Sequence, residues 1–334
     1  MPRRTLVALS LAVVFVLSWT GAALGAPGGI GPPSPQTNSG EAISELYWVV
    51  FSICALVFVG VETALVLFVI RFRRRRDTPE DAEGPQIHGN TRLEVIWTII
   101  PSLILAGIAV FTLTRIPAVE AKGSDELVVR VEAHQFYWQY VYPNGAISLD
   151  ELRLPVDRTV ALELTTKDVN HSWWVPPLTG KMDAIAGQTN VLRFKPETTG
   201  TWEGQCAELC GIQHAVMYTR VHVVEQSEFD SWVDDQLAIA DEELGQQEWE
   251  AVCAKCHGLE GEGGVGPPIA GNGTLRNRQG LIQLLSNGQN TPQFPGYMPP
   301  VGLGWNGKQY DALIAYVKAT PAISGAQEGA ESGG

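Results

Sequence analysis

The sequence predicts a multi-domain membrane protein in three parts: a hairpin of two transmembrane helices, an all-β sandwich or barrel, and a small C-terminal domain. Three observations predict this fold class. Two long apolar runs lie between residues 46 and 114, short β-rich runs separated by turn residues follow from 126 to 224, and a compact segment occupies residues 245–320. A chain of 334 residues is long enough for several such units.

The first 26 residues have the order of a secretory signal peptide. Arg3 and Arg4 come first, an apolar stretch runs from Leu6 to Leu17, and small residues end the segment. An uncleaved third span is the alternative. Residues 27–45 are rich in Gly, Pro and Ser, so we expect a flexible segment outside the membrane.

Residues 46–70 and 95–114 are long enough, as helices, to cross an apolar layer about 30 Å thick. Five arginines between residues 71 and 76 place the connecting loop, 71–94, on the cytoplasmic side. Everything from residue 115 onward therefore lies on the opposite side. The first span holds one charge, Glu62, which is costly in lipid. We expect it to face a partner helix or a polar cavity, as a structural contact rather than a proton relay.

Residues 115–225 have the composition and spacing of one all-β domain. Five strands are expected in it: Leu127–Val131, Phe136–Tyr142, Thr159–Thr166, Asn190–Phe194 and Met217–Val224. An acidic, helix-permissive linker spans 226–244. The small domain, 245–320, ends in a helix over 308–318, and a disordered tail spans 321–334.

The net charge of −13 falls entirely beyond the membrane spans, because residues 1–114 hold equal numbers of acidic and basic side chains. An acidic outer region argues against nucleic acid binding. It could attract a basic protein partner, although an ordinary soluble surface explains the charge equally well.

The strongest motif in the β-rich region is a loop with Cys206, Cys210, His214 and Met217, preceded 43 residues before His214 by His171. Thiolates, imidazoles and a thioether form a soft ligand set that suits copper, and suits zinc less well because of the methionine. Two sulfurs offered together could bridge two copper ions, and a backbone carbonyl between the cysteines could be a further ligand. A structural zinc site and a disulfide between the two cysteines are the alternatives.

The C-terminal segment carries the haem-attachment pattern Cys253-Ala-Lys-Cys256-His257. Two thiols would bind the haem covalently and His257 would bind its iron. Met298, which lies 41 residues after His257, is the expected second axial ligand. A redox disulfide is the alternative, but the strand–helix–strand setting typical of such disulfides is missing from the pattern.

Residues 41–224 resemble cytochrome c oxidase subunit II with its binuclear copper A centre. The resemblance rests on the copper loop and on three supporting segments: Glu94-Val-Ile-Trp-Thr-Ile-Ile-Pro101, His134-Gln-Phe-Tyr-Trp-Gln-Tyr140 and His171-Ser-Trp-Trp-Val-Pro176. The C-terminal segment is similar to class I cytochromes c in its haem motif and in Gly266-Pro-Pro268. Together they resemble an oxidase subunit II of the caa3 type.

The resemblance implies a cupredoxin-like Greek-key barrel on the helical hairpin and a small all-α cytochrome c domain. It implies these copper A ligands: His171, Cys206, Cys210, His214, Met217 and the backbone carbonyl of Glu208. The Glu208 carboxylate would contact a magnesium ion shared with the catalytic subunit. Glu94 would stand at the entrance of a proton pathway; a helix-start acid that favours the helix dipole is its alternative reading.

Phe136 departs from the family pattern, because many members have a tryptophan there that receives electrons from a docked soluble cytochrome. The resemblance therefore leaves that docking route in doubt here. Trp138, two residues later, is a second aromatic candidate for the electron path, or a core-filling side chain. A cytochrome attached to the same chain has a high effective concentration near the copper centre and depends less on such docking.

The predicted function is therefore electron transfer in a respiratory oxidase of the bacterial cell membrane. Electrons from an upstream cytochrome c or cytochrome bc complex would pass through haem c and copper A to a separate haem–copper catalytic subunit I, which reduces oxygen to water and pumps protons. The spans of this chain hold no histidine cluster for the oxygen chemistry. The rival readings are the corresponding subunit of a nitric oxide reductase, and a membrane-anchored electron carrier without a fixed catalytic partner.

Overall fold

The computed structural model describes residues 31–73, 84, 86, 88–119, 123, 125–291 and 294–325. The chain divides into two compact units, one with the two long helices and one with residues 34–40 and 120–334. The predicted signal peptide and the last nine residues of the predicted tail lie outside the described residues.

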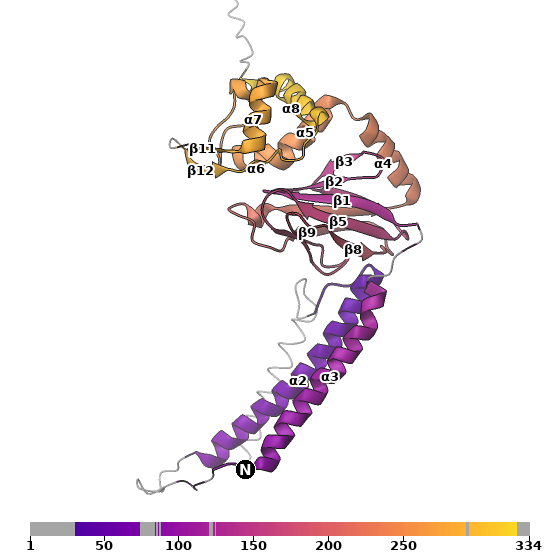
Figure 1. The fold of residues 1–334 in the computed structure, drawn as a ribbon, viewed down its shortest axis with the longest axis vertical. Coiled ribbons are helices and arrows are strands. Elements are labelled where there is room, and N and C mark those ends of the chain that lie inside the picture. The colour runs from indigo at the N-terminus through magenta and orange to yellow at the C-terminus, as the bar shows by residue number, and fades with distance from the viewer. Residues whose placement is uncertain are drawn as a thin grey trace, which may run out of the picture. The chain divides into compact units, whose positions relative to one another are not determined.

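The first unit contains two long apolar helices, α2 (Asn38–Phe72) and α3 (Thr91–Val119) (Figure 1). Their mean hydropathies over the most apolar windows are 2.7 and 2.2, and both are long enough to cross a membrane. Arg115 pairs with Glu45 at 3.0 Å between the two helices. Helix α2 begins eight residues before the predicted span, because the Thr37 hydroxyl accepts the amide of Gly40 at 2.9 Å and caps the first turn.

The β-rich part of the second unit is a sandwich of two five-stranded sheets, with strand orders β3-β2-β1-β5-β8 and β4-β10-β9-β6-β7. The first sheet contains β1 (Leu127–His134), β2 (Tyr137–Val141), β3 (Ile147–Leu149), β5 (Val160–Thr166) and β8 (Asn190–Phe194). The second contains β4 (Glu151–Pro155), β6 (His171–Trp174), β7 (Met182–Ala184), β9 (Gly200–Cys206) and β10 (Tyr218–Val224). The two inner faces share one apolar core that includes Trp138, Trp173 and Leu162.

The five predicted strands are present, and the described sandwich has five more that were not predicted. Most of the missed strands are short: β3 and β7 have three residues and β6 has four. Strand β9 has seven residues but buries only two of them, so its sequence lacks the apolar alternation that identifies a strand.

The helix-permissive linker predicted over 226–244 is helical over most of its length, and its first helix packs on the sandwich. Helix α4 (Gln226–Ala238) buries Phe229 and Val233 against the sandwich, and the ring of Trp232 lies 5.0 Å from that of Tyr142. These side chains recur at helical spacing, so one face of α4 extends the apolar core.

The C-terminal region is mainly helical, with one short hairpin. Its elements are α5 (Asp241–Glu248), the π-helical turn η2 (Trp249–Cys253), α6 (Ala254–His257), the 3-10 turn η3 (Gly273–Arg276), α7 (Arg278–Asn287), β11 (Gln289–Thr291), β12 (Phe294–Met298), α8 (Gly307–Ala319) and α9 (Pro321–Ser324). Helices α5 and α8 cross so closely that a Cβ on Gly245 would lie 2.1 Å from the carbonyl oxygen of Ala312. The tail prediction is wrong for α9, because Ile323 is fully buried in this core.

Candidate metal and haem sites

Three neighbouring strands of the second sheet bring the predicted copper ligands together. Cys206 ends β9, His171 begins β6, and Met217 directly precedes β10, while Cys210 and His214 lie in the loop between β9 and β10. The Cys206 amide donates to the carbonyl of Met217 at 3.0 Å, which ties the two ends of that loop together. The sheet register therefore brings residues from three elements to one place.

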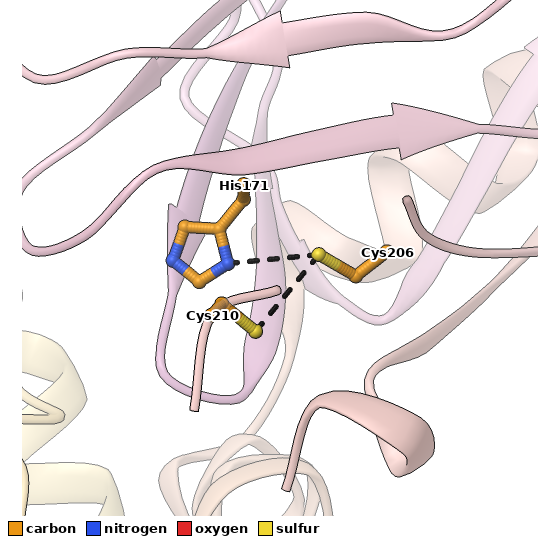
Figure 2. Close-up of side chains that lie close together, drawn as sticks. All are labelled: His171, Cys206 and Cys210. Atoms are coloured by element: carbon orange, nitrogen blue, oxygen red, sulfur yellow. Dashed lines mark hydrogen bonds between the residues drawn. The ribbon is translucent and has the colours of Figure 1, made fainter. Parts of the chain in front are cut away.

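All five side chains converge. The Cys206 sulfur lies 3.9 Å from the Cys210 sulfur and 3.8 Å from His171 Nδ1, as Figure 2 shows. The Cys210 sulfur lies 3.6 Å from His214 Nδ1 and 3.8 Å from the sulfur of Met217. A disulfide needs sulfurs about 2.0 Å apart, so the two cysteines are free thiols here.

A carboxylate behind His171 fixes the orientation of the imidazole. Asp168 Oδ1 lies 2.9 Å from His171 Nε2, which leaves Nδ1 directed at the Cys206 sulfur. Asp168 is held in turn by the Gln135 amide at 2.7 Å and the Thr166 hydroxyl at 2.8 Å. Burial alone would raise the pKa of Asp168, but these hydrogen bonds, with that of His171 largest, lower it. A carboxylate–histidine pair of this kind is typical of metal sites.

The ionisation of each of the two cysteines depends on the other, because their sulfurs lie 3.9 Å apart. The contact between the two sulfurs lowers the pKa of Cys206 to about 3 and raises the pKa of Cys210. Thiolates are the form that binds metal ions. The donor set of two sulfurs, two imidazoles and a thioether fits copper better than zinc, which rarely takes methionine.

Glu208 and Glu94 have different surroundings. The Glu208 carbonyl oxygen lies 3.2 Å from the Cys206 sulfur and faces the site, whereas its side chain is exposed. The Glu94 carboxylate accepts the amide of Asn90 at 3.2 Å, so it caps the start of α3. This contact favours the structural reading of Glu94, and its proton role stays a prediction.

The two aromatic candidates both lie beside the metal site. Trp138 is fully buried, and its ring meets that of His171 edge-on at 6.1 Å. Phe136 is 6% exposed, and a Cβ on Gly211 in the copper loop would lie 3.0 Å from its ring. Trp138 therefore contacts a predicted copper ligand as well as filling the core.

The haem-attachment motif occupies η2 and α6. His257 Nδ1 lies 2.7 Å from the carbonyl oxygen of Pro267, which leaves Nε2 available for an iron ion. A Cβ on Gly266 would lie 2.7 Å from the His257 ring, so this turn requires a glycine. Cys253 is buried, and Met298, at the end of β12, packs against the same apolar core as Cys253. These residues fit a haem c.

Sequence reasoning missed two polar residues at these sites. Asp168 lies three residues before His171, and this short spacing from a predicted ligand was the available signal. Gln213 precedes His214 and is 8% exposed, but its partners lie more than 40 residues away in the sequence, so no local signal identifies it.

Family models match three parts of the chain. They describe the periplasmic domain of cytochrome c oxidase subunit II over residues 147–224, the transmembrane domain of the same subunit over 27–114, and subunit III of cbb3-type cytochrome c oxidase over 240–317.

Curated relatives are named cytochrome c oxidase subunit 2. The protein of that name from Alkalihalophilus pseudofirmus is 33% identical over 294 residues, which is 81% of this chain and 85% of the relative. The one from Bacillus subtilis is 33% identical over 260 residues, or 70% and 73%. A crystal structure of the periplasmic domain of subunit II of the Bradyrhizobium japonicum oxidase is 33% identical, covers 34% of this chain and 94% of that domain, and has a TM-score of 0.33.

Proposed function

This chain belongs to the cytochrome c oxidase subunit II family and carries a cytochrome c-type domain. We propose that electrons enter a haem–copper oxidase through this chain and pass from haem c to a copper A pair. The oxygen-reducing site belongs to another chain, the catalytic subunit I. The observation that carries the proposal is the convergence of two cysteines, two histidines and one methionine on neighbouring strands.

The proposed copper ligands are those side chains together with the carbonyl of Glu208. When bound, a copper pair accepts and releases one electron at a time. The protein holds its ligands in a rigid sheet, so little rearrangement accompanies each transfer. Asp168 keeps His171 in the orientation that presents Nδ1. The exposed side chain of Glu208 is available to a magnesium ion shared with the catalytic subunit.

Cys253 and Cys256 would hold the proposed haem c covalently, and His257 and Met298 would bind its iron. The carbonyl of Pro267 supports this assignment, because it fixes the ring tautomer that leaves Nε2 free. Ligation by His and Met favours a high reduction potential, as an electron carrier requires.

Glu62 on helix α2 is the proposed contact with the catalytic subunit in the membrane. Glu62 is exposed on the apolar helix α2, where a charge facing lipid is costly. A contact with the catalytic subunit would remove that cost. The copper and haem regions would lie on the extracytoplasmic side of a bacterial membrane, opposite the arginine-rich loop, and receive electrons from a cytochrome c or a cytochrome bc complex.

Spectra of the purified membrane complex test the proposal. We expect the optical band of a c-type haem and the electron spin resonance signal of a mixed-valence copper pair, together with oxygen consumption. Uptake of zinc alone at the loop cysteines, or a complex that consumes nitric oxide and not oxygen, would contradict it.

A further inference from the structure

The haem-attachment run lies directly against the copper domain, within one compact unit. Lys255, between the two haem cysteines, donates to the carbonyl oxygen of Phe136 at 3.0 Å and forms an ion pair with Asp150. The side chains of Lys255 and Asp150 are only 19% and 20% exposed. A second carboxylate oxygen of Asp150 accepts the amide of Trp138 at 2.8 Å, so the acceptor is itself held in place.

The copper loop also contacts the haem-attachment run through Gln213. The Gln213 side-chain amide donates to the carbonyl oxygen of Lys255 at 2.9 Å and lies 3.9 Å from the Cys256 sulfur. Gln213 is the residue before the proposed ligand His214, and it is 8% exposed. One buried amide therefore connects the residue next to a copper ligand with the residues that would hold the haem.

A second set of contacts joins the copper domain to the segment after Met298. The Tyr137 hydroxyl donates to the carbonyl oxygen of Val301 at 2.6 Å and accepts from Trp305 Nε1 at 2.9 Å. Tyr137 is fully buried within the apolar cluster of the C-terminal region. The copper domain thus contacts the chain beside both proposed axial ligands of the haem.

We propose that Lys255 and Gln213 are positioning residues that keep the cytochrome domain docked on the copper loop, so that it does not reach the copper centre by swinging on its linker. This inference rests on the proposed function of the two sites. Hydrogen bonds to a charged group are stronger than neutral ones, and burial protects this ion pair from screening. Loss of the Lys255 contacts should lower the ratio of docked to undocked domain about ten- to hundredfold.

Docking also covers the surface around Phe136. The Lys255 ammonium donates a hydrogen bond to the carbonyl oxygen of Phe136, and Phe136 is 6% exposed. A separate soluble donor cannot contact Phe136 while the domain is docked. We therefore expect such a donor not to pass electrons through Phe136.

The test uses the complete membrane complex with its cofactors. Three variants break the contacts: Lys255→Met, Gln213→Leu and Asp150→Asn. Asparagine at position 150 can still accept the Trp138 amide and tolerates the backbone φ of 57°. Three exposed residues give matched controls: Lys308→Met, Gln188→Leu and Asp157→Asn, the last with a φ of 61°.

Two measurements are made on each complex. Hydrogen exchange of backbone amides should become about tenfold faster or more over residues 136–141 and 253–257 in the contact variants, and stay unchanged in the controls. The internal rate at which haem c is reoxidised after photochemical reduction should fall, with the potentials of both centres unchanged.

Equal exchange and equal internal rates in contact variants and controls would overturn the docking proposal, if the wild-type complex shows both the c-type haem band and the copper-pair signal. Absence of either signal in the wild type would instead contradict the proposed function. Asp150→Asn covers the case in which Lys255→Met impairs haem attachment, because it breaks the same ion pair from the copper domain.

Discussion

The proposed copper site and the proposed haem site each draw on several side chains, but the chain holds them in different ways. His171, Cys206 and Met217 stand at the ends of three neighbouring strands, whose backbone hydrogen bonds fix their separation. Cys256 and His257 share one short helix, whereas Met298 comes from a hairpin 41 residues later. A site built on sheet register is preorganised by the fold. A site assembled from distant helical and hairpin segments needs the bound group to complete it.

The largest effect should follow from removing the haem. In the double variant Cys253→Ala and Cys256→Ala, we expect loss of the c-type haem and protease sensitivity across residues 245–320. Cys253 belongs to the apolar core around Trp249 and Leu313, which would lose the group that completes it. Haem staining and limited proteolysis of the purified complex measure the two effects.

The copper domain should stay resistant to protease in that double variant, because its core is separate. Cys54→Ala is the control, since Cys54 is exposed on α2 and takes part in neither site. A haem-free C-terminal region that resists protease as well as the wild type would refute the contrast between the two sites.

Asp168→Asn tests the preorganisation of the copper site. The variant keeps an oxygen for the Gln135 amide but removes the charge beside His171, so we expect copper affinity to fall about 10- to 100-fold. A competition titration with a copper chelator measures this. Asp125→Asn is the control, because Asp125 is 86% exposed and pairs only with Arg158 among the described residues. Unchanged copper affinity in Asp168→Asn would show that the sheet alone orients His171.

Glu248→Gln tests how a buried carboxyl affects the stability of the cytochrome domain. Glu248 is fully buried, and burial raises the pKa of its carboxyl to about 9, although a contact with Gln309 acts in the opposite direction. The folded state therefore binds a proton that the unfolded state releases near pH 4.5. The stability that this protonated carboxyl contributes is fully present below pH 4.5. It is lost as the pH rises from there through the folded-state pKa of about 9.

The glutamine variant should lack this decline. We expect it to melt about 5–10 °C above the wild type at pH 8 and within about 2 °C of it at pH 5. Thermal unfolding of the cytochrome domain, followed by its haem absorption, measures both. Gln246, exposed on the same helix, gives the control Gln246→Glu, which should show no such pH dependence. A pH-independent difference between Glu248→Gln and the wild type would contradict the buried, protonated state.

The smallest effect should come from Phe136→Trp. If the docked domain covers this position, a tryptophan there gives no gain in turnover with free soluble cytochrome. The measured quantity is that rate divided by the rate with a small-molecule reductant, which corrects for any strain beside Gly211. A large gain in this ratio would show that a soluble donor reaches the copper domain directly.

The sequence predicted the fold class because its signals are local. The apolar length of each span, the β-rich runs and the Cys-x-x-Cys-His pattern can each be read within about 25 residues. Strands β6 and β9 were missed because they are short or expose most of their side chains, although β6 carries His171 and β9 carries Cys206. The ligands were recognised by chemistry and spacing, and the strands that hold them were not.

The sequence by itself determined which side chains could bind copper and haem, since ligand type and short spacing are properties of the chain. Only the tertiary structure decided that Asp168 orients His171, that α4 packs on the sandwich, and that Gln213 and Lys255 connect the two sites. The contacts between the two sites join residues 42 to 168 positions apart. Sheet register and packing of the whole chain set such contacts, and no local pattern encodes them.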